Sequence, residues 1–331
     1  MGLDHHRWKA LAVASVTTAA TLLGVSVASA TSRSMFKPPF DFSIRDSRQP
    51  PAPGGPRPYT ATGLNAAWSV IAWNIPGGDL PSFQRSKKGA DTIFVSHAAE
   101  ASVTVEQQPD GQARYSLSQD GAALPCNTSE GRPRESDLFA HPNEAQNKFE
   151  TNAHLAKTGS VKINNLASLI SVATLSYSAR LSVPHRECPV AQGAAVIALI
   201  LRDPVDRQTL FYQVELSQAC GLQPDPRAAR CEHLAKVPRP NFFARTAPFG
   251  IDDPLPLHGQ PFLSNRETKK LSIDLLPRMK AAIAAGPEGM SRDPSHWTVT
   301  GYYNGQIIFG GLRMETTWAN VSLIAVDKKQ D

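Results

Sequence analysis

The sequence is poor in cysteine, poor in aromatic residues and without a strong excess of either charge. Its 331 residues include four cysteines and 7% aromatic side chains, and the formal net charge is +5. Lysine and arginine are scattered, and their densest runs are pairs such as Lys87-Lys88. A nucleic-acid-binding protein typically carries a basic stripe or cluster, so we expect no nucleic-acid partner.

Specific catalytic and metal-binding motifs are missing as well. The chain contains neither the G-x-S-x-G nucleophile elbow of many hydrolases nor the H-E-x-x-H motif of zinc peptidases. No histidine is paired by spacing with a particular serine and aspartate. These patterns therefore predict no metal site and no cofactor, although calcium stays open as a ligand because Asp252-Asp253 offers the oxygen atoms that it prefers.

The chain has one long uncharged run, and it lies at the N-terminus. Arg7 and Lys9 precede residues 10–27, which carry no charge, and Ala-Ser-Ala follows at 28–30. These are the three parts of a secretory signal peptide. We predict that residues 1–30 are removed and that the mature protein is secreted or periplasmic.

The rival interpretation of this run is an uncleaved membrane anchor, which its serine and threonine hydroxyls disfavour. No later segment is long and apolar enough to span a bilayer. The mature chain is therefore expected to be soluble.

The even number of cysteines in an exported chain favours disulfide bonds. Cys220 and Cys231 flank a loop with prolines and a glycine that suits a closed turn. We therefore predict the pairs Cys220–Cys231 and Cys126–Cys188. A zinc site built from Cys231 and His233 is the alternative, although the paired Cys-x-x-Cys spacing of structural zinc is missing.

Proline is abundant, with 27 residues, and segments that suit a helix are few. Residues 31–58 are rich in proline, and this composition predicts an extended or disordered leader. Residues 124–157 are polar and poorly periodic, which indicates a long excursion. The strongest strand is 175–183, where apolar side chains occupy every second position, and 196–201 is apolar on both faces, as in a central strand.

Turn and cap signals divide the rest of the chain. Asp110-Gly111 and Asn304-Gly305 each predict a hairpin turn. The apolar parity changes after Trp318, which predicts a bulge at Ala319-Asn320. One helix is predicted, with Asp274 as its cap, Pro277 in its first turn and Gly286 at its end.

Many short strands with turns between them predict a mostly β fold. The expected architecture is an antiparallel, jelly-roll-like β-sandwich with one or two short helices. The domain covers residues 59–331, either as one sandwich or as two sub-domains, 59–157 and 158–331.

The final part of the chain resembles known jelly-roll modules. The segments that carry the resemblance are Leu271-Ser-Ile-Asp-Leu-Leu, Trp297-Thr-Val-Thr-Gly-Tyr-Tyr and Thr317-Trp-Ala-Asn-Val-Ser-Leu-Ile-Ala-Val326. Together they are similar to the closing strands of carbohydrate-binding and concanavalin-like modules. The resemblance implies glycan binding and includes no family-defining motif.

Two glutamates are the candidate catalytic residues. Glu215 and Glu315 each lie in mid-strand, on the parity opposite the apolar side chains. Glycoside hydrolysis requires two carboxyl groups that face a sugar, ~5–5.5 Å apart for retention or ~6.5–9.5 Å for inversion. Neighbouring strands of one sheet could place them so. The simpler interpretation is that each is a solvated residue on an outer face.

Aromatic and polar residues on the same strands give candidate ligand contacts. Tyr302 has the parity opposite to Trp297 and Tyr303, so it is predicted to be the exposed aromatic that stacks on a sugar ring. Gln213 and Arg313 share the polar faces of the two glutamates and are predicted to contact the ligand.

Three hypotheses of function follow from these residues. The first is an exported carbohydrate-binding protein with a glycan as its partner. The second is a secreted polysaccharide-degrading enzyme, a glycoside hydrolase or lyase, that uses Glu215 and Glu315. The third is a structural envelope protein without catalysis.

Overall fold

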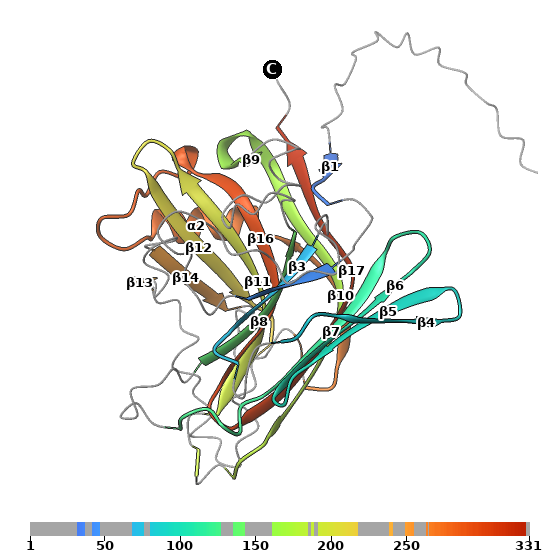
Figure 1. Ribbon diagram of the computed structural model, residues 1–331. Helices are drawn as coiled ribbons and strands as arrows, with labels where there is room; N and C mark the ends of the chain where they lie inside the picture. The colour runs from blue at the N-terminus through green and yellow to red at the C-terminus, as the bar shows by residue number, and fades with distance from the viewer. Residues whose placement is uncertain are drawn as a thin grey trace, which may run out of the picture.

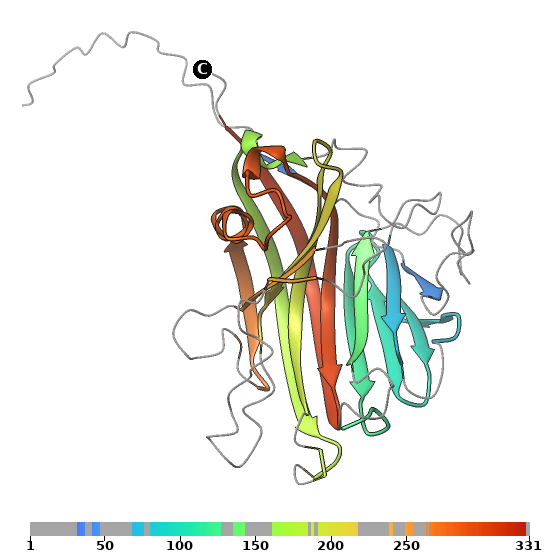
Figure 2. The same cartoon turned by 90° about the vertical axis from the view of Figure 1, so that its left-hand side faces the viewer.

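The computed structural model describes residues 32–36, 42–46, 68–75, 80–126, 135–142, 161–184, 187–188, 191–217, 238–240, 249–254, 263 and 265–328. Two β-sheets pack on each other with a hydrophobic core between them (Figures 1 and 2). The predicted fold class is confirmed, because the described residues form a mostly β, jelly-roll-like sandwich with one α-helix.

Sheet A has eight strands, and all its neighbours are antiparallel. Its order is β15-β10-β17-β7-β6-β5-β4, and β1 pairs with the far end of β17. In Figure 1, β4, β5 and β6 extend away from the rest of the molecule. The strands are β1 (Ser32–Ser34), β4 (Gln84–Lys88), β5 (Asp91–His97), β6 (Ala101–Gln107), β7 (Ala113–Asp120), β10 (Leu166–Leu181), β15 (Thr268–Asp274) and β17 (Leu312–Asp327).

Sheet B has nine strands in the order β13-β14-β12-β11-β16-β8-β3-β2, and β9 also pairs with β16. The pairs β12–β14 and β2–β3 are parallel, and the others are antiparallel. The strands are β2 (Phe42–Asp46), β3 (Trp68–Trp73), β8 (Glu135–Pro142), β9 (Val161–Lys162), β11 (Gln192–Asp203), β12 (Gln208–Glu215), β13 (Pro238–Pro240), β14 (Phe249–Pro254) and β16 (Thr298–Phe309).

Strands from the two proposed sub-domains share both sheets. In sheet A, β7 pairs with β17, and in sheet B, β8 pairs with β16. The described strands of residues 59–157 and 158–331 therefore lie in the same two sheets. The excursion expected over residues 124–157 is wrong for 135–142, because β8 is a strand inside sheet B.

The leader prediction for residues 31–58 is wrong where the structure describes this segment. β1 pairs with residues 324–326 of the last strand, and β2 pairs with β3. Met35 and Phe36 are buried in the main core. The prolines of the leader flank these short pieces, so their composition hid two strands that depend on distant partners.

The helix forms where it is expected, as α2 (Leu276–Ala284). The Asp274 carboxylate accepts hydrogen bonds from the backbone N–H groups of Leu276 and Leu169, both at 3.0 Å. The Gly286 N–H donates to the carbonyl of Ile283 just after the last turn. Asp274 therefore fixes the start of the helix and ties it to the adjacent β10. Two short 3-10 turns, η2 (Ile163–Asn165) and η5 (Pro294–His296), complete the described elements.

The bulge predicted at Ala319-Asn320 is confirmed. The pairing of β10 with β17 shifts between Val172–Ser322 and Thr174–Ala319, which leaves an extra residue on β17. Asn320 has a positive φ of 53° at this point. The shift lets Trp318 and Val321 both enter the core although their parity differs.

One of the two predicted hairpin turns is confirmed and the other is wrong. Gly111, with φ 83°, closes the turn between β6 and β7. Asn304-Gly305 instead lies inside the continuous strand β16. There the Asn304 side chain donates to the Tyr115 hydroxyl in the core, and Gly305 lets β8 approach, since a Cβ would lie 2.2 Å from the Leu138 carbonyl oxygen.

The predicted disulfide Cys126–Cys188 is present, with 4.8 Å between the two Cα atoms. Cys220, Cys231 and His233 lie outside the described residues, as does the predicted signal peptide at 1–30. In the part of the chain that the structure describes, no helix is long and apolar enough to cross a membrane.

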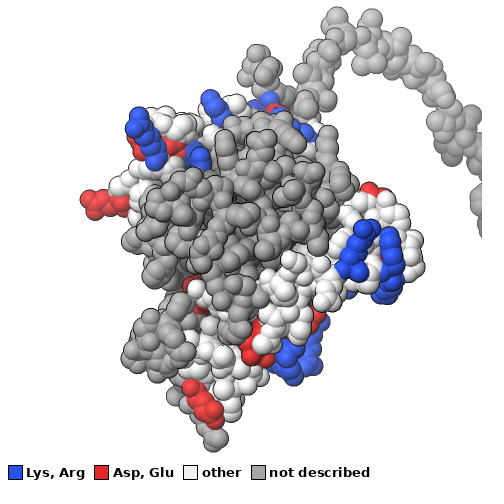
Figure 3. All heavy atoms as spheres, in the orientation of Figure 1, with Lys and Arg blue, Asp and Glu red and all other residues white. Residues whose placement is uncertain are grey.

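Lysine and arginine do not gather on one surface in the described part of the chain that Figure 3 presents. They lie in separate groups, with acidic residues between some of them.

Candidate functional site

Sheet B carries buried apolar side chains on both of its faces. The main core lies between the sheets and draws on both of them. A second cluster contains residues of sheet B alone and lies on the side turned away from sheet A, here called the outer face of sheet B. A sheet of a sandwich needs only one apolar face to fold, so this face is the candidate site. Its apolar residues are Ile71, Phe139, Ala194, Val196, Ala198, Ile200, Tyr303 and Ile307, with Phe211 and Phe309 packed against them.

The central strand of this face is β11, as its apolar run predicts. β11 lies between β12 and β16, and all of its residues except Arg202 are buried. Alternate side chains enter the main core and the outer face of sheet B.

Glu215 and Gln213 project onto the outer face of sheet B from β12. Their neighbours Tyr212 and Val214 enter the main core, so the intervening side chains point the other way. Both are buried, with 3% of Glu215 and 5% of Gln213 exposed. The interpretation of Glu215 as a solvated surface residue is therefore wrong.

Glu315 and Arg313 lie on the other sheet. Met314 and Thr316 are buried inside the sandwich, so Arg313 and Glu315 point into solvent on the outer face of sheet A. Arg313 forms a long ion pair with Asp120, 3.7 Å between Nη1 and Oδ2. The surface interpretation of Glu315 is the one the structure supports.

The structure does not bring Glu215 and Glu315 together. The two side chains point away from each other on opposite sides of the sandwich. Packed sheets lie about 10 Å apart, and the core fills the space between them. The prediction that these two carboxylates converge on one sugar is therefore wrong.

The predicted exposure of Tyr302 is also wrong. Its side chain is fully buried in the main core, where its ring centroid lies 4.9 Å from that of Phe36. The cause is a bulge in β16: Ile200 pairs with Gly301 but Leu201 pairs with Val299, so Thr300 is an extra residue. The parity of β16 reverses there, which turns Tyr302 inward and Tyr303 onto the outer face of sheet B. Among the described residues, Val205 alone is an exposed large hydrophobic residue.

The aromatic pair of the outer face of sheet B is Tyr303 and His141. Their rings are stacked, with 5.0 Å between centroids and 26° between planes. Phe211 and Phe139 meet the Tyr303 ring edge-on at 6.0 and 6.1 Å. The small Ala198, which pairs with both Tyr303 and Gln213, lies between β12 and β16 on this face.

A carboxyl pair on β8 completes the polar groups of this face. Glu135 and Asp137 lie two residues apart, on the parity of Phe139, and a side-chain hydrogen bond joins them. Burial raises the pKa of Asp137 well above its usual range, and the adjacent Glu135 raises it further. A carboxyl group in this setting retains its proton at a pH where an exposed aspartate has lost it.

No local pattern indicates the carboxyl pair, because residues 135–142 show no clean alternation of apolar and polar residues. Ser136 faces the main core and accepts a hydrogen bond from Gln119 of sheet A. The polar residue inside and the phenylalanine outside reverse the usual pattern of a sandwich strand.

Glu215 and the carboxyl pair lie on the same face but on different strands. Glu215 pairs with Val196, Val196 with Gly305, and Gly305 with Phe139 of β8. At ~4.8 Å for each strand, the row from Glu215 to Phe139 spans about 14 Å between Cα atoms, and Asp137 lies two residues farther along β8. The carboxylates therefore flank a strip of the face rather than contact each other.

Asp253, a candidate calcium ligand, is bound by other side chains. It is buried, and its two carboxylate oxygens accept hydrogen bonds from Arg278 at 2.7 and 3.0 Å and from the Tyr212 hydroxyl at 2.6 Å. A guanidinium thus already balances its charge. The calcium hypothesis gains no support from this side chain. One other group, Asp203, Asp206 and His296, has the spacing of metal ligands in the described part of the chain.

No protein-family model and no curated protein matches the chain. Solved structures that are similar include the family GH12 endoglucanase 3 of Trichoderma harzianum, at 10% identity and a TM-score of 0.39, which covers 75% of this chain and 96% of that one. A family 12 xyloglucanase from Bacillus licheniformis matches at 12% identity and 0.40, over 77% and 99% of the two chains. The family 11 xylanase of Neocallimastix patriciarum matches at 6% and 0.33, over 77% and 96%. Similarity at this level identifies neither a family nor a reaction for this chain.

Proposed function

We propose that the protein is an exported carbohydrate-binding protein that holds a glycan against the outer face of sheet B. The observation that carries this proposal is the stack of Tyr303 and His141 with polar side chains around it. Sugar rings have an apolar C–H face and a rim of hydroxyls. Ligand sites accordingly combine aromatic surface with a few convergent polar groups.

The polar groups of the face suit hydroxyl recognition. Gln213 offers a carbonyl and an amide, and Glu215 offers acceptor oxygens. Asp137, with its raised pKa, offers a donor when it is protonated. A face with both donors and acceptors can satisfy sugar hydroxyls, each of which gives and takes hydrogen bonds.

Glycan binding at the outer face of sheet B requires that the buried aromatic pair becomes accessible. Tyr303 is 4% exposed and His141 6%, so a sugar ring reaches the stack only when these two side chains become more exposed. The proposal therefore implies that glycan binding and the exposure of Tyr303 are coupled.

A glycan array with the purified mature protein tests the proposal, with release of reducing ends measured in parallel. Gln213→Ala should lower the affinity for the bound glycan about tenfold, which corresponds to one lost hydrogen bond in a site. Arg313→Ala on the outer face of sheet A is the matched control and should bind as the wild type does. Equal loss in both variants, or no binding to any glycan, contradicts the proposal, and the latter result favours the structural role.

Hydrolysis is a second candidate, favoured by the raised pKa of Asp137 on the same face as Glu215. Here Asp137 would protonate the leaving oxygen, and Glu215 would take a proton from a water molecule that attacks the anomeric carbon from the other side of the sugar. The inverting reaction requires ~6.5–9.5 Å between the carboxyl groups, so the Asp137 and Glu215 side chains must extend toward each other across β11 and β16. Asp137→Asn and Glu215→Gln should each abolish release of reducing ends, while Glu315→Gln retains it; no release by the wild type rules out this candidate.

A further inference from the structure

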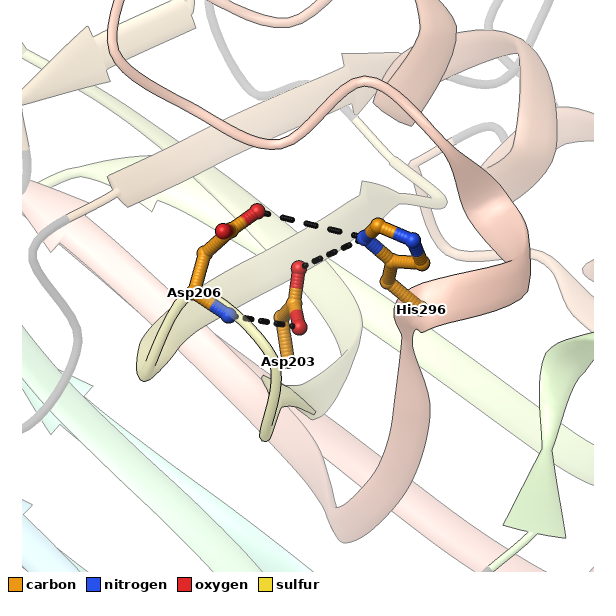
Figure 4. Close-up of side chains that lie close together, drawn as sticks. All are labelled: Asp203, Asp206 and His296. Atoms are coloured by element: carbon orange, nitrogen blue, oxygen red, sulfur yellow. Dashed lines mark hydrogen bonds and ion pairs between the residues drawn. The ribbon is translucent and has the colours of Figure 1, made fainter.

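Three side chains with metal-binding atoms meet at one end of sheet B (Figure 4). Asp203 is the last residue of β11, Asp206 lies in the turn that leads to β12, and His296 belongs to η5. His296 Nδ1 is 3.5 Å from Asp203 Oδ2 and 3.9 Å from Asp206 Oδ2. All three ligand atoms lie within 4.8 Å of one another.

Asp203 is buried and aims one oxygen into this group. Its residue is 1% exposed, and its Oδ1 accepts the N–H groups of Val205 at 2.8 Å and Asp206 at 3.2 Å. Its Oδ2 is buried without a hydrogen bond and faces the imidazole of His296. Leaving a buried carboxylate oxygen without a hydrogen bond is unfavourable, so a cation at this point would satisfy it.

A third carboxylate, that of Asp293, lies near the other nitrogen of the imidazole. Asp293 Oδ2 is 3.7 Å from His296 Nε2, on the opposite side of the ring from Asp203. Histidines that bind a metal through one nitrogen commonly direct the other N–H to a carboxylate, which fixes the tautomer. A proton on Nε2 leaves the Nδ1 lone pair directed at Asp203 and Asp206.

We propose that Asp203, Asp206 and His296 bind one divalent metal ion of the zinc type. One imidazole nitrogen with carboxylate oxygens is a zinc-like donor set, whereas calcium takes oxygen ligands. Zinc binds these atoms at ~2.0–2.2 Å in a tetrahedron, so its ligand atoms lie ~3.3–3.5 Å apart. The two aspartate oxygens lie 3.5 and 3.9 Å from His296 Nδ1 and within 4.8 Å of each other, so the three ligand atoms move closer together when the ion binds.

The surroundings allow the ion to enter and supply a fourth donor. The side chains of His296 and Asp206 are 35% and 47% exposed, so the site is open on one side. Ser291 Oγ lies 3.3 Å from His296 Nδ1 and offers an oxygen next to the three ligands. Water can occupy that position as well.

The ion would fasten two segments that already touch. Gln208, at the start of β12, accepts the Ser291 N–H and donates to the Gly289 carbonyl, both at 2.7 Å. The metal adds a second link between the β11–β12 turn and the segment that leads into β16. The site is therefore structural, and it is independent of the glycan proposal.

Calorimetry and thermal melting of the EDTA-treated full mature chain test the site, with zinc chloride as the probe and calcium chloride for comparison. We expect one zinc ion per chain, a rise of several degrees in Tm with zinc and no rise with calcium. Asp206→Asn and His296→Asn should each weaken zinc binding at least tenfold. Asp110→Asn, in the β6–β7 turn where Asp110 accepts the Gln112 N–H at 2.9 Å, is the matched control and should bind zinc normally.

Two results would overturn the proposal. One is the absence of zinc binding at millimolar concentration, and the other is zinc binding that both site variants retain. If His296 instead forms an ion pair with its aspartates, His296→Asn lowers the Tm of the metal-free protein and zinc has no effect on the wild type.

Discussion

Asp137 and Glu135 lie two residues apart on one face of β8, joined by a hydrogen bond between their carboxyl groups in a buried setting. Burial first, and the adjacent Glu135 second, raise the pKa of Asp137. The folded state therefore favours the protonated form of Asp137, which links the outer face of sheet B to pH.

The stability of the protein should fall as this proton is lost. Because the pKa of Asp137 is higher in the folded than in the unfolded chain, the folded state binds more protons between these two values. The stabilisation is complete below the ordinary aspartate pKa and is lost as pH rises through the raised value. Asp137→Asn cannot ionise, so its unfolding free energy should exceed that of the wild type above the raised pKa, by on the order of 1 kcal/mol.

Urea denaturation over a range of pH measures this difference. Glu315→Gln, which removes an exposed carboxylate on sheet A, serves as the control and should leave the pH profile of the wild type unchanged. A profile for Asp137→Asn that parallels the wild type would show that Asp137 is not the titrating group.

The Arg278–Asp253–Tyr212 network should respond unequally to the loss of its members. Arg278 neutralises a carboxylate that is fully buried, while the Tyr212 hydroxyl adds a single hydrogen bond. Arg278→Met removes this guanidinium from the buried Asp253 carboxylate, and breaking a buried ion pair in this way typically costs about 3–5 kcal/mol. Tyr212→Phe should cost only about 1–2 kcal/mol.

A double variant separates the charge from the packing. Asp253→Asn combined with Arg278→Met removes both charges, so it should recover part of the stability lost in Arg278→Met alone. Chemical denaturation of the wild type, the single variants Arg278→Met and Asp253→Asn, and the double variant gives the coupling between the two residues. A double variant that is less stable than Arg278→Met would contradict the charge argument.

Local patterns in the sequence were sufficient to predict an element of the fold where one of its faces meets water and the other meets the core. The alternation over 175–183 predicts the strand β10, because successive side chains of a strand point to opposite faces and here one face is apolar and the other polar. Asp274 and Gly286 mark the two ends of α2, and the change of parity after Trp318 marks the bulge in β17. Each of these features is set by residues close together in the chain.

The residues whose positions were predicted wrongly are placed by partners far away in the chain. Glu215 and Glu315 have the same local pattern, yet β12 and β17 belong to different sheets, and only long-range pairing decides that. Tyr302 and Tyr303 exchange faces because of a bulge opposite Ile200 and Leu201, about a hundred residues earlier. β1 has no apolar pattern of its own and is ordered by the end of β17.

The disulfide Cys126–Cys188 should contribute strongly to stability. It closes a loop with a sequence separation of 62 residues, which includes β8, β9 and β10. Loop-closure entropy of this length corresponds to about 4 kcal/mol. The Cys126→Ser, Cys188→Ser double variant should therefore lose about that much unfolding free energy in urea. A loss well below 2 kcal/mol would mean that the unfolded chain is already constrained in this region.

Asn320 tests the bulge that joins the two halves of β17. Its φ of 53° lies in the left-handed region, which glycine and asparagine tolerate and β-branched residues do not. Asn320→Gly should therefore be neutral or slightly stabilising, and Asn320→Val should cost about 1–2 kcal/mol. Because Asn320 is exposed, lost packing cannot account for such a difference. Glu315→Val, at an exposed position with regular pairing on the same strand, should change stability by less than about 0.5 kcal/mol. If valine is tolerated equally at both positions, the left-handed conformation does not limit which residue can occupy position 320.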